Sequence, residues 1–299
     1  MTLSPETVAT LVAAGLDPAA VSSLVRGAIA EDLAGGVDVT TSATVPAAQR
    51  ARLELVARGS GVAAGIPVAA AVYDVVGEGR CIVEQLVADG ATVDPGSALL
   101  GVTGPVADLL VAERTSLNLL CHLSGIATLT RRWVDAIAGS GAAIRDTRKT
   151  TPGLRALEKY AVRCGGGSNH RMSLSDAALV KDNHVVAAGG VAQAFAAVRA
   201  KWPDVPVEVE VDSLAQLDEV LAVGADLVLL DNFALVDLVE AVQRTAGRAR
   251  LEASGGLTLA SAAEVAATGV DFLAVGALTH SAPVLDIGAD LTPTTEGVG

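Results

Sequence analysis

The 299-residue chain has few aromatic residues and a shortage of positive charge. It contains two Trp, two Tyr and three Phe, and its 21 Lys and Arg face 34 Asp and Glu, which gives a formal net charge of −13. Nucleic-acid binding needs basic surface to neutralise phosphates and, for single strands, aromatic platforms on which bases stack. We therefore expect no nucleic-acid partner.

Cysteine is also scarce. Cys81, Cys121 and Cys164 are odd in number and far apart, so they do not suggest a disulfide framework. We expect reduced thiols and a cytoplasmic location.

Long hydrophobic runs are missing as well. The longest apolar region, 62–76, is interrupted by Gly65, Pro67 and Asp74, and the first 20 residues lack the basic start and apolar core of a signal peptide. The sequence predicts no membrane association. With 51% hydrophobic residues, the chain can still bury a substantial core.

The four histidines show no zinc-site spacing. His122, His170, His184 and His280 form no HExxH motif, and no CxxC pair accompanies them. His170 precedes Arg171 and is a candidate ligand contact, whereas His184 is interpreted as a structural residue.

One stretch has the opposite charge to the rest of the chain. Residues 145–181 hold eight Lys or Arg and three acids, a net charge of +5. They include three of the four lysines, and Gly165-Gly166-Gly167 interrupts the stretch. A cationic pool inside an acidic protein concentrates anionic ligands, although a solvated helix face is the simpler alternative. We favour a small polyanion as the ligand.

The first part of the chain predicts a small α+β unit. Asp17-Pro18 caps a helix that continues to about Leu33. The other expected elements are an extended connection at 37–46, a strand with a turn at 51–65, a helix at 67–76, short β runs at 81–105, and helices at 106–123 and 126–138.

From residue 142 onward the pattern alternates. Six short apolar runs are separated by segments with helical spacing: 142–146, 177–181, 205–211, 226–231, 249–254 and 272–276. Alternating β and α units imply a parallel sheet, and six in series predict a closed or nearly closed α/β barrel.

Polar and glycine residues follow these runs at their carboxyl ends, the face on which barrel enzymes build their sites. They are Asp146 to Lys149, Lys181 and Asp182, Glu210 and Asp212, Asp231 and Asn232, Ser254-Gly255-Gly256, and Gly276. The glycines, with a helix expected from Leu259, suit a phosphate, although an ordinary βα turn remains an alternative. Arg148, Lys149, Arg171 and Lys181 suit carboxylates and phosphates.

The acids Glu210 and Asp231 face this basic rim. They could ligate Mg²⁺ held by substrate phosphates, stabilise positive charge on a sugar, or form structural ion pairs with the same lysines.

Several motifs resemble the quinolinate phosphoribosyltransferases, the carboxylating nicotinate-nucleotide pyrophosphorylases. They are AERTSLNLLCHLSGIAT (112–128), RDTRKTTPGLRALEKYAV (145–162), CGGGSNHR (164–171), LSDAALVKDNH (174–184), EVEVDS (208–213), LLDNF (229–233), EASGG (252–256) and AVGALTHS (274–281). Met172-Ser173 and Ala253 depart from the expected pattern without removing a charged group.

The resemblance implies an N-terminal α/β sandwich domain, residues 1–113 with 282–299 returning to it, and a TIM-like open α/β barrel over 114–281. It further implies a homodimer that converts quinolinate and phosphoribosyl pyrophosphate to nicotinate mononucleotide, pyrophosphate and CO₂, with Mg²⁺.

Site residues also follow from the resemblance. Quinolinate carboxylates would be held by Arg148, His170, Arg171 and Lys181, with Arg114 entering the site of the partner subunit. Thr147 and Lys149 would contact ligand, Glu210 and Asp231 would lie near the ribose and metal, and Ser254 to Gly256 and Val275 to Ala277 (with Gly276) would form the phosphate loops. Lys149, Lys181, Glu210 and Asp231 would be catalytic.

Three other functions remain open at this point. They are the related phosphoribosyltransferase of molybdenum transport operons, a Schiff-base aldolase using Lys181 or Lys149, and a phosphate-ligand sensor without enzymatic activity.

Overall fold

The computed structural model describes residues 3–294, which form two compact units. Of these residues, those up to Leu129, Pro152–Gly166 and those from Ser281 onward make up the first unit. Thr130–Thr151 and Gly167–His280 make up the second. This division differs from the predicted boundary at 113/114, because a long helix over 106–136 stays in the first unit as far as Leu129, and residues 152–166 join that unit as well.

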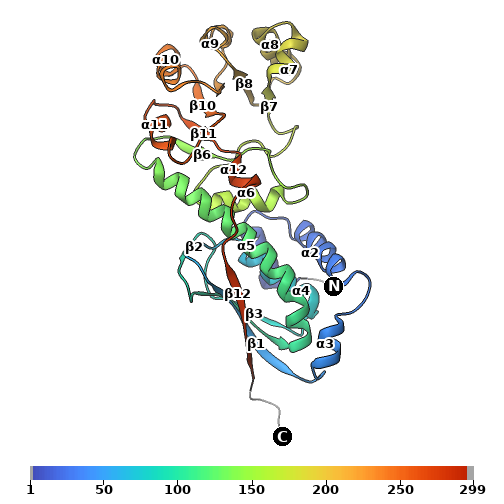
Figure 1. Ribbon diagram of the computed structural model, residues 1–299. Coiled ribbons are helices and arrows are strands. Elements are labelled where there is room, and N and C mark those ends of the chain that lie inside the picture. The colour runs from blue at the N-terminus through green and yellow to red at the C-terminus, as the bar shows by residue number, and fades with distance from the viewer. Residues whose placement is uncertain (1–2, 295–299) are drawn as a thin grey trace. The chain divides into compact units, whose positions relative to one another are not determined.

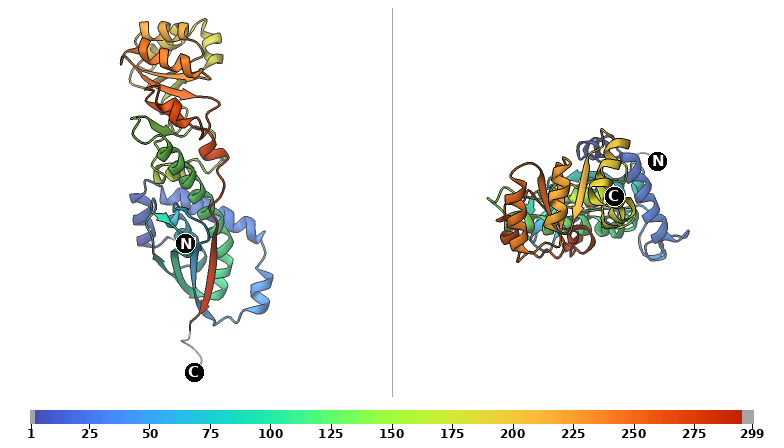
Figure 2. Two further views of the ribbon diagram at one scale, coloured as in Figure 1. Left: turned by 60° about the vertical axis from the view of Figure 1, so that its left-hand side comes forward. Right: turned by 90° about the horizontal axis from the view of Figure 1, so that it is seen from above.

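The first unit is built on a four-stranded antiparallel sheet in the order β12-β1-β5-β3 (Figure 1). The strands are β1 (Arg50–Ala57), β3 (Ile82–Gln85), β5 (Ala98–Pro105) and β12 (Ile287–Pro293), and a separate pair joins β2 (Gly61–Val62) to β4 (Thr92–Val93). Figure 2 shows β12 running beside β1, so the C-terminal segment returns to this unit. Residues 295–299 of the expected return lie outside the described part of the chain.

Helices complete the first unit. They are α1 (Pro5–Ala13), α2 (Pro18–Leu33), α3 (Val39–Thr44), α4 (Ile66–Gly77), α5 (Val106–Ala136) and α6 (Arg155–Cys164), of which α5 extends past Leu129. Asp17 caps α2 by accepting a hydrogen bond from the backbone of Ala19, as the sequence predicts. The expected extended connection at 37–46 is wrong, because Asp38 caps α3 by accepting from the backbone of Thr40 and Thr41.

The expected break at Gly125 is also wrong, because α5 runs through it. A Cβ atom at Gly125 would lie 2.2 Å from the carbonyl oxygen of Pro283 and 2.8 Å from Cα of Val284. Gly125 therefore allows the backbone of Pro283 and Val284 to approach α5 closely, and it does not end the helix. Ser124 and Thr128 on the same helix accept backbone hydrogen bonds from Ala64 and Val62, which fixes this part of α5 to the first unit.

The second unit is a six-stranded parallel sheet in the order β6-β11-β10-β9-β8-β7, and all six predicted strands are confirmed. They are β6 (Ala143–Arg145), β7 (Ala178–Val180), β8 (Val207–Val211), β9 (Leu227–Asp231), β10 (Arg250–Ser254) and β11 (Phe272–Ala274). The helices are α7 (Asp182–Ala188), α8 (Val191–Lys201), α9 (Leu214–Ala222), α10 (Leu235–Thr245), α11 (Ala262–Ala266) and α12 (Ala277–His280). In this order β6 and β7 lie at the two ends, which makes the unit an open α/β barrel.

Strand alternation sorts side chains between the two faces of this sheet. In β8, Val207, Val209 and Val211 are at most 1% exposed and share one face, which places Glu208 and Glu210 on the other. In β10 the same alternation separates Leu251 and Ala253 from Glu252 and Ser254. Charged groups from several strands are thereby gathered on one face.

Within residues 3–294, no single helix is long and apolar enough to cross a bilayer. The bent pair α1 and α2 meets the length and composition criteria only when its two helices are taken together.

Replacing Gly125 with alanine should destabilise the first unit, because its new Cβ atom would meet backbone atoms that cannot rotate away. We expect urea denaturation to show a loss of about 1–3 kcal/mol, the usual cost of overpacking. Gly27→Ala in α2 is the matched control, since a Cβ there meets nothing within 4 Å and alanine favours a helix by about 0.5–1 kcal/mol over glycine. Equal stability of the two variants would contradict the close-approach explanation.

Candidate active site

A cavity of about 380 Å³ lies at the carboxyl ends of the parallel strands in the second unit. Its lining brings together nine of the residues singled out in the sequence: Thr147, Arg148, Lys149, His170, Arg171, Lys181, Glu210, Asp231 and Ser254. Leu179, Leu229, Glu252 and Ala274 complete it. Residues from six separate segments thus converge on one space, as the strand-end pattern predicts.

Other predicted contacts lie elsewhere. Gly255 and Gly256 line a neighbouring cavity of about 230 Å³ that shares Ser254, and Val275, Gly276 and Ala277 line neither. The helix expected from Leu259 begins at Ala262 and has only five residues, so little helix dipole is available to a phosphate. Arg114 is exposed on α5 in the first unit.

Glycine at position 255 is required by its surroundings. Gly255 has φ +90°, and a Cβ there would lie 2.1 Å from Oδ1 of Asn232. The turn after β10 therefore packs directly against the turn after β9.

Positive charge dominates one wall of the cavity. Nε of Arg148 is buried and has no hydrogen-bond partner within the described residues, and Arg171 donates one guanidinium hydrogen bond to the carbonyl of Ala177 at 3.0 Å. Burial, followed by the charge of Arg148, lowers the pKa of Arg171. Two guanidinium groups that repel each other in a partly buried cavity favour an anion between them.

The opposite wall carries acids. Glu210 accepts a hydrogen bond from Nζ of Lys181 at 2.8 Å, which is the ion pair left open as an alternative by the sequence. Asp231 accepts from the side chain of Asn232 at 2.8 Å. Lys181 is half exposed, so this pair adds little stability and can rearrange around a ligand.

Asp146 anchors the loop that carries His170 and Arg171. It is fully buried and accepts hydrogen bonds from the backbone N–H of His170 at 2.8 Å and the side chain of Asn169. The hydroxyl group of Ser168 donates to the carbonyl of Ile144, which ties the same loop to β6. His184 likewise has a structural contact, because its Nδ1 accepts from the backbone of Lys181 at 3.0 Å.

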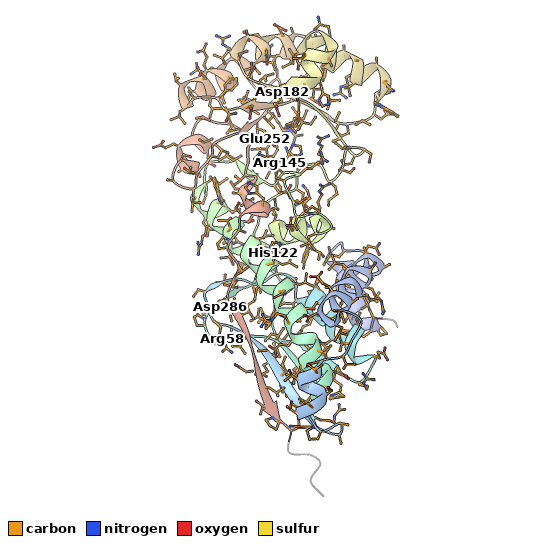
Figure 3. All side chains as sticks on the ribbon, turned by 45° about the vertical axis from the view of Figure 1, so that its right-hand side comes forward. Arg58, His122, Arg145, Asp182, Glu252 and Asp286 are labelled. Carbon is orange, nitrogen blue, oxygen red and sulfur yellow. The ribbon has the colours of Figure 1, made fainter. Side chains whose placement is uncertain are left out.

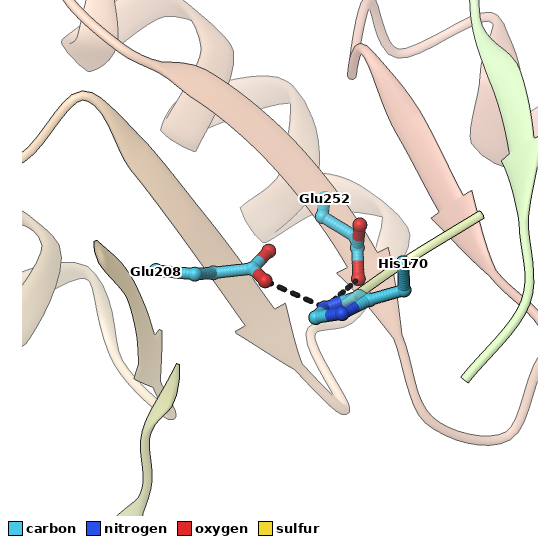
Figure 4. A group of neighbouring side chains, drawn as sticks. All are labelled: His170, Glu208 and Glu252. Carbon is cyan, nitrogen blue, oxygen red and sulfur yellow. Dashed lines mark ion pairs between the residues drawn. The ribbon is translucent and has the colours of Figure 1, made fainter. Parts of the chain in front are cut away.

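Behind the cavity lies a buried charge cluster that the sequence analysis missed. Nε2 of His170 is 2.6 Å from Glu208 and 3.6 Å from Glu252. Figure 4 shows the ring between the two carboxylates, with both ion pairs as dashed lines. Arg145 pairs with Glu252, and Figure 3 shows these two side chains next to each other. The signal in the sequence is the presence of acids inside otherwise apolar strands, VEVEV and RLEAS, and not at the strand ends.

Burial and the neighbouring charge of Glu208 raise the pKa of Glu252 to about 7, against the opposing effects of Arg145 and His170. Glu252 is 0% exposed, so water does not screen these interactions.

The cluster has three potential metal-ligand atoms within 4.8 Å of one another, but its hydrogen bonds do not suit a metal. Nδ1 of His170 accepts from the backbone N–H of Arg171 at 2.7 Å, so in the neutral ring Nε2 carries the proton. Nε2 therefore has no lone pair to offer, and Arg145 already supplies positive charge to the carboxylates.

Comparisons with known sequences show which proteins this chain is similar to. Residues 38–124 match the family Quinolinate phosphoribosyl transferase, N-terminal domain, and residues 126–290 match Quinolinate phosphoribosyl transferase, C-terminal domain. The nicotinate-nucleotide pyrophosphorylase [carboxylating] of Mycobacterium leprae is 57% identical over 271 residues, which are 89% of this chain and 95% of that protein.

Solved structures agree with these matches. The crystal structure of NadC from Streptococcus pyogenes has a TM-score of 0.89 at 40% identity and covers 93% of this chain and 99% of its own. The nicotinate-nucleotide pyrophosphorylase from Francisella tularensis has a TM-score of 0.87 at 37% identity, with coverage of 91% and 96%.

The raised pKa of Glu252 has a consequence for stability. Its protonated form stabilises the fold fully below the pKa of the unfolded chain, near 4.3, and that contribution is lost as pH rises to about 7. The test compares the unfolding free energies of the wild type and Glu252→Gln. The value for the wild type minus the value for the variant should fall by up to about 3 kcal/mol between pH 4 and 8, because each pKa unit corresponds to roughly 1.4 kcal/mol.

Denaturation at a series of pH values measures this difference. Glu219→Gln, at an exposed position on α9, is the control and should show no such trend. A difference that rises with pH would mean that Glu252 is an ordinary ionised partner of Arg145.

Proposed function

The chain belongs to the quinolinate phosphoribosyltransferase family, and from this premise we propose that it transfers a phosphoribosyl group to quinolinate with loss of CO₂. The products are nicotinate mononucleotide, pyrophosphate and CO₂. The enzyme is a pentosyltransferase that serves NAD biosynthesis.

The observation that carries this proposal is the buried Nε atom of Arg148, which has no hydrogen-bond partner among the described residues, in a cavity that Arg171 also lines. Quinolinate carries two adjacent carboxylates, and planar guanidinium groups bind carboxylates through paired hydrogen bonds. Arg148, Arg171 and Lys181 are the proposed carboxylate ligands. His170 supports them from the cavity wall, because both of its ring nitrogens already have protein partners.

The second substrate, phosphoribosyl pyrophosphate, suits the remaining charges. Lys149 and Lys181 neutralise pyrophosphate as it leaves, and Thr147 and Ser254 offer hydroxyl groups to phosphate oxygens. Positive charge then develops on the ribose, where the carboxylates of Glu210 and Asp231 stabilise it. The ring nitrogen of quinolinate attacks this centre, and no covalent enzyme intermediate is needed.

Mg²⁺ fits the acids on this wall. Hard cations prefer carboxylate and phosphate oxygens, and Glu210 and Asp231 supply such oxygens within the same cavity. These two residues would hold Mg²⁺ together with the substrate. The ion would neutralise pyrophosphate oxygens.

Schiff-base aldolase chemistry is less well supported, because it needs a neutral lysine amine. Nζ of Lys181 is engaged by Glu210 at 2.8 Å and is therefore not free to attack a carbonyl carbon. A cytoplasmic location agrees with three free cysteines.

The function is tested by incubating the protein with quinolinate, phosphoribosyl pyrophosphate and Mg²⁺ and measuring CO₂ and nicotinate mononucleotide. Equimolar formation of both is expected. Unaltered substrates after prolonged incubation would favour a sensor, and an adduct trapped by borohydride with a carbonyl substrate would favour the aldolase. Turnover of a different phosphoribosyl acceptor, with none of quinolinate, would favour the transferase of molybdenum operons.

Removal of either cavity arginine should weaken quinolinate binding. For Arg148→Ala and Arg171→Ala we expect KM for quinolinate to rise by roughly 10- to 100-fold, since a charged hydrogen bond contributes about 1.5–3 kcal/mol. Arg199→Ala on α8, which removes an exposed pair with Asp226, should leave KM unchanged. Near-normal KM in both cavity variants would contradict the carboxylate assignment.

We further propose a homodimer in which Arg114 enters the site of the partner subunit. Arg114→Ala and Asp231→Asn should each abolish most activity alone, and co-refolded mixtures should recover up to about one quarter of wild-type activity, because mixed dimers have one intact site. Activity that stays at the level of the single variants would place the action of Arg114 within its own chain.

A further inference from the structure

Glu252 is a buried acid on the wall of the cavity, and the proposed transfer step gives it no task. It lines the cavity together with Ser254, its neighbour on the same face of β10. Its register partner on β9 is Leu229, which pairs in turn with Glu210 on β8. Glu252 therefore lies at the same level of the barrel as Glu210, on the lining of the cavity proposed to hold both substrates.

The hydrogen bonds around Glu252 show which groups hold protons. Nδ1 of His170 accepts from the backbone of Arg171, so Nε2–H points to Glu208 at 2.6 Å and not to Glu252 at 3.6 Å. Glu208 accepts this hydrogen bond, as an ionised carboxylate does best. The proton of His170 is thus committed to Glu208.

Glu252 is left with one hydrogen-bond partner, Arg145, among the described residues. Its Oε2 accepts from Arg145, and its Oε1 is buried without a hydrogen bond within residues 3–294. Two carboxylates therefore share one guanidinium group, since Arg145 is also 4.0 Å from Glu208. Because the pKa of Glu252 is raised to about 7, a substantial fraction of this carboxyl group is protonated at neutral pH.

The proposed reaction needs such a proton. When the 2-carboxylate leaves the pyridinium ring as CO₂, the electron pair of the broken C–C bond stays on C2. That carbanion recaptures CO₂ unless a proton reaches it. An acid held at the cavity wall prevents this return.

We propose that the carboxyl group of Glu252 donates the proton that replaces the 2-carboxylate at C2, an inference that rests on the function proposed above. The O–H bond of Glu252 breaks and a C–H bond forms at C2. The O–H electron pair stays on Glu252, whose carboxylate is then stabilised by Arg145. Water returns the proton after product release.

Other groups in the cavity are less suited to this transfer. Arg148 and Arg171 bear guanidinium groups that keep their protons at neutral pH. The ammonium group of Lys181 donates to Glu210, and His170 and Glu208 hold each other in place. His170 and Glu208 are therefore positioning residues for Glu252.

A single-turnover experiment tests the proposal. Wild type and Glu252→Gln are mixed with Mg²⁺, phosphoribosyl pyrophosphate and quinolinate labelled in its 2-carboxylate, and pyrophosphate and CO₂ are quantified over time. We expect the variant to release pyrophosphate within about threefold of the wild-type rate but CO₂ at least about 10²-fold more slowly, the usual contribution of a general acid. The undecarboxylated mononucleotide should accumulate.

Three results would overturn the inference. The first is that Glu252→Gln forms both products at wild-type rates. The second is that it forms both products equally slowly, which would indicate a purely structural role. The third is that the wild type does not turn over, which would remove the proposed function as well. Glu219→Gln on α9 is the matched control and should behave as the wild type.

If Glu252→Gln fails to fold, the proposal is tested with the wild type alone. The ratio of CO₂ to pyrophosphate in the first turnover should then fall as pH rises from 6 to 9, because Glu252 loses its proton. The charged and titratable groups facing it are Arg145, His170 and Glu208. A constant ratio across this range would overturn the inference.

Discussion

The repulsion between Arg148 and Arg171 is the interaction on which the site depends. Two guanidinium groups line one partly buried cavity, and Nε of Arg148 finds no hydrogen-bond partner within the described chain. Two positive groups in a partly buried cavity are electrostatically unfavourable unless a ligand or buried acids of the protein supply negative charge. The fold does the second through buried acids: Asp146 fixes the loop that carries Arg171, and Glu208 and Glu252 lie around His170.

This electrostatic balance explains why the acids of β8 and β10 occur within strands. An alternating strand directs every second side chain to the same face, so Glu208 and Glu210 perform different tasks at two depths. Glu210 reaches the cavity and pairs with half-exposed Lys181, whereas buried Glu208 holds the ring of His170. The cavity thus combines a partly exposed outer charge pair with a buried inner one.

Much of the second unit could be predicted from sequence because its strands are short apolar runs with polar residues at their carboxyl ends. Glu208 and Glu252 were missed because their role depends on which strands become neighbours, and Glu252 faces His170 only after β10 takes its place between β9 and β11. The continuity of α5 could not be predicted either, since the need for Gly125 arises from a segment more than 150 residues later. Arg114 lines neither cavity, so its expected role in the site of a partner subunit stays a prediction.

Calorimetric titration of the wild type with quinolinate and with nicotinate, at one pH and ionic strength, tests the central claim most directly. If Arg148 and Arg171 together require a second carboxylate, quinolinate should bind at least about 100-fold more tightly than nicotinate, equivalent to roughly 2.7 kcal/mol. Equal affinity for the two ligands would contradict the account.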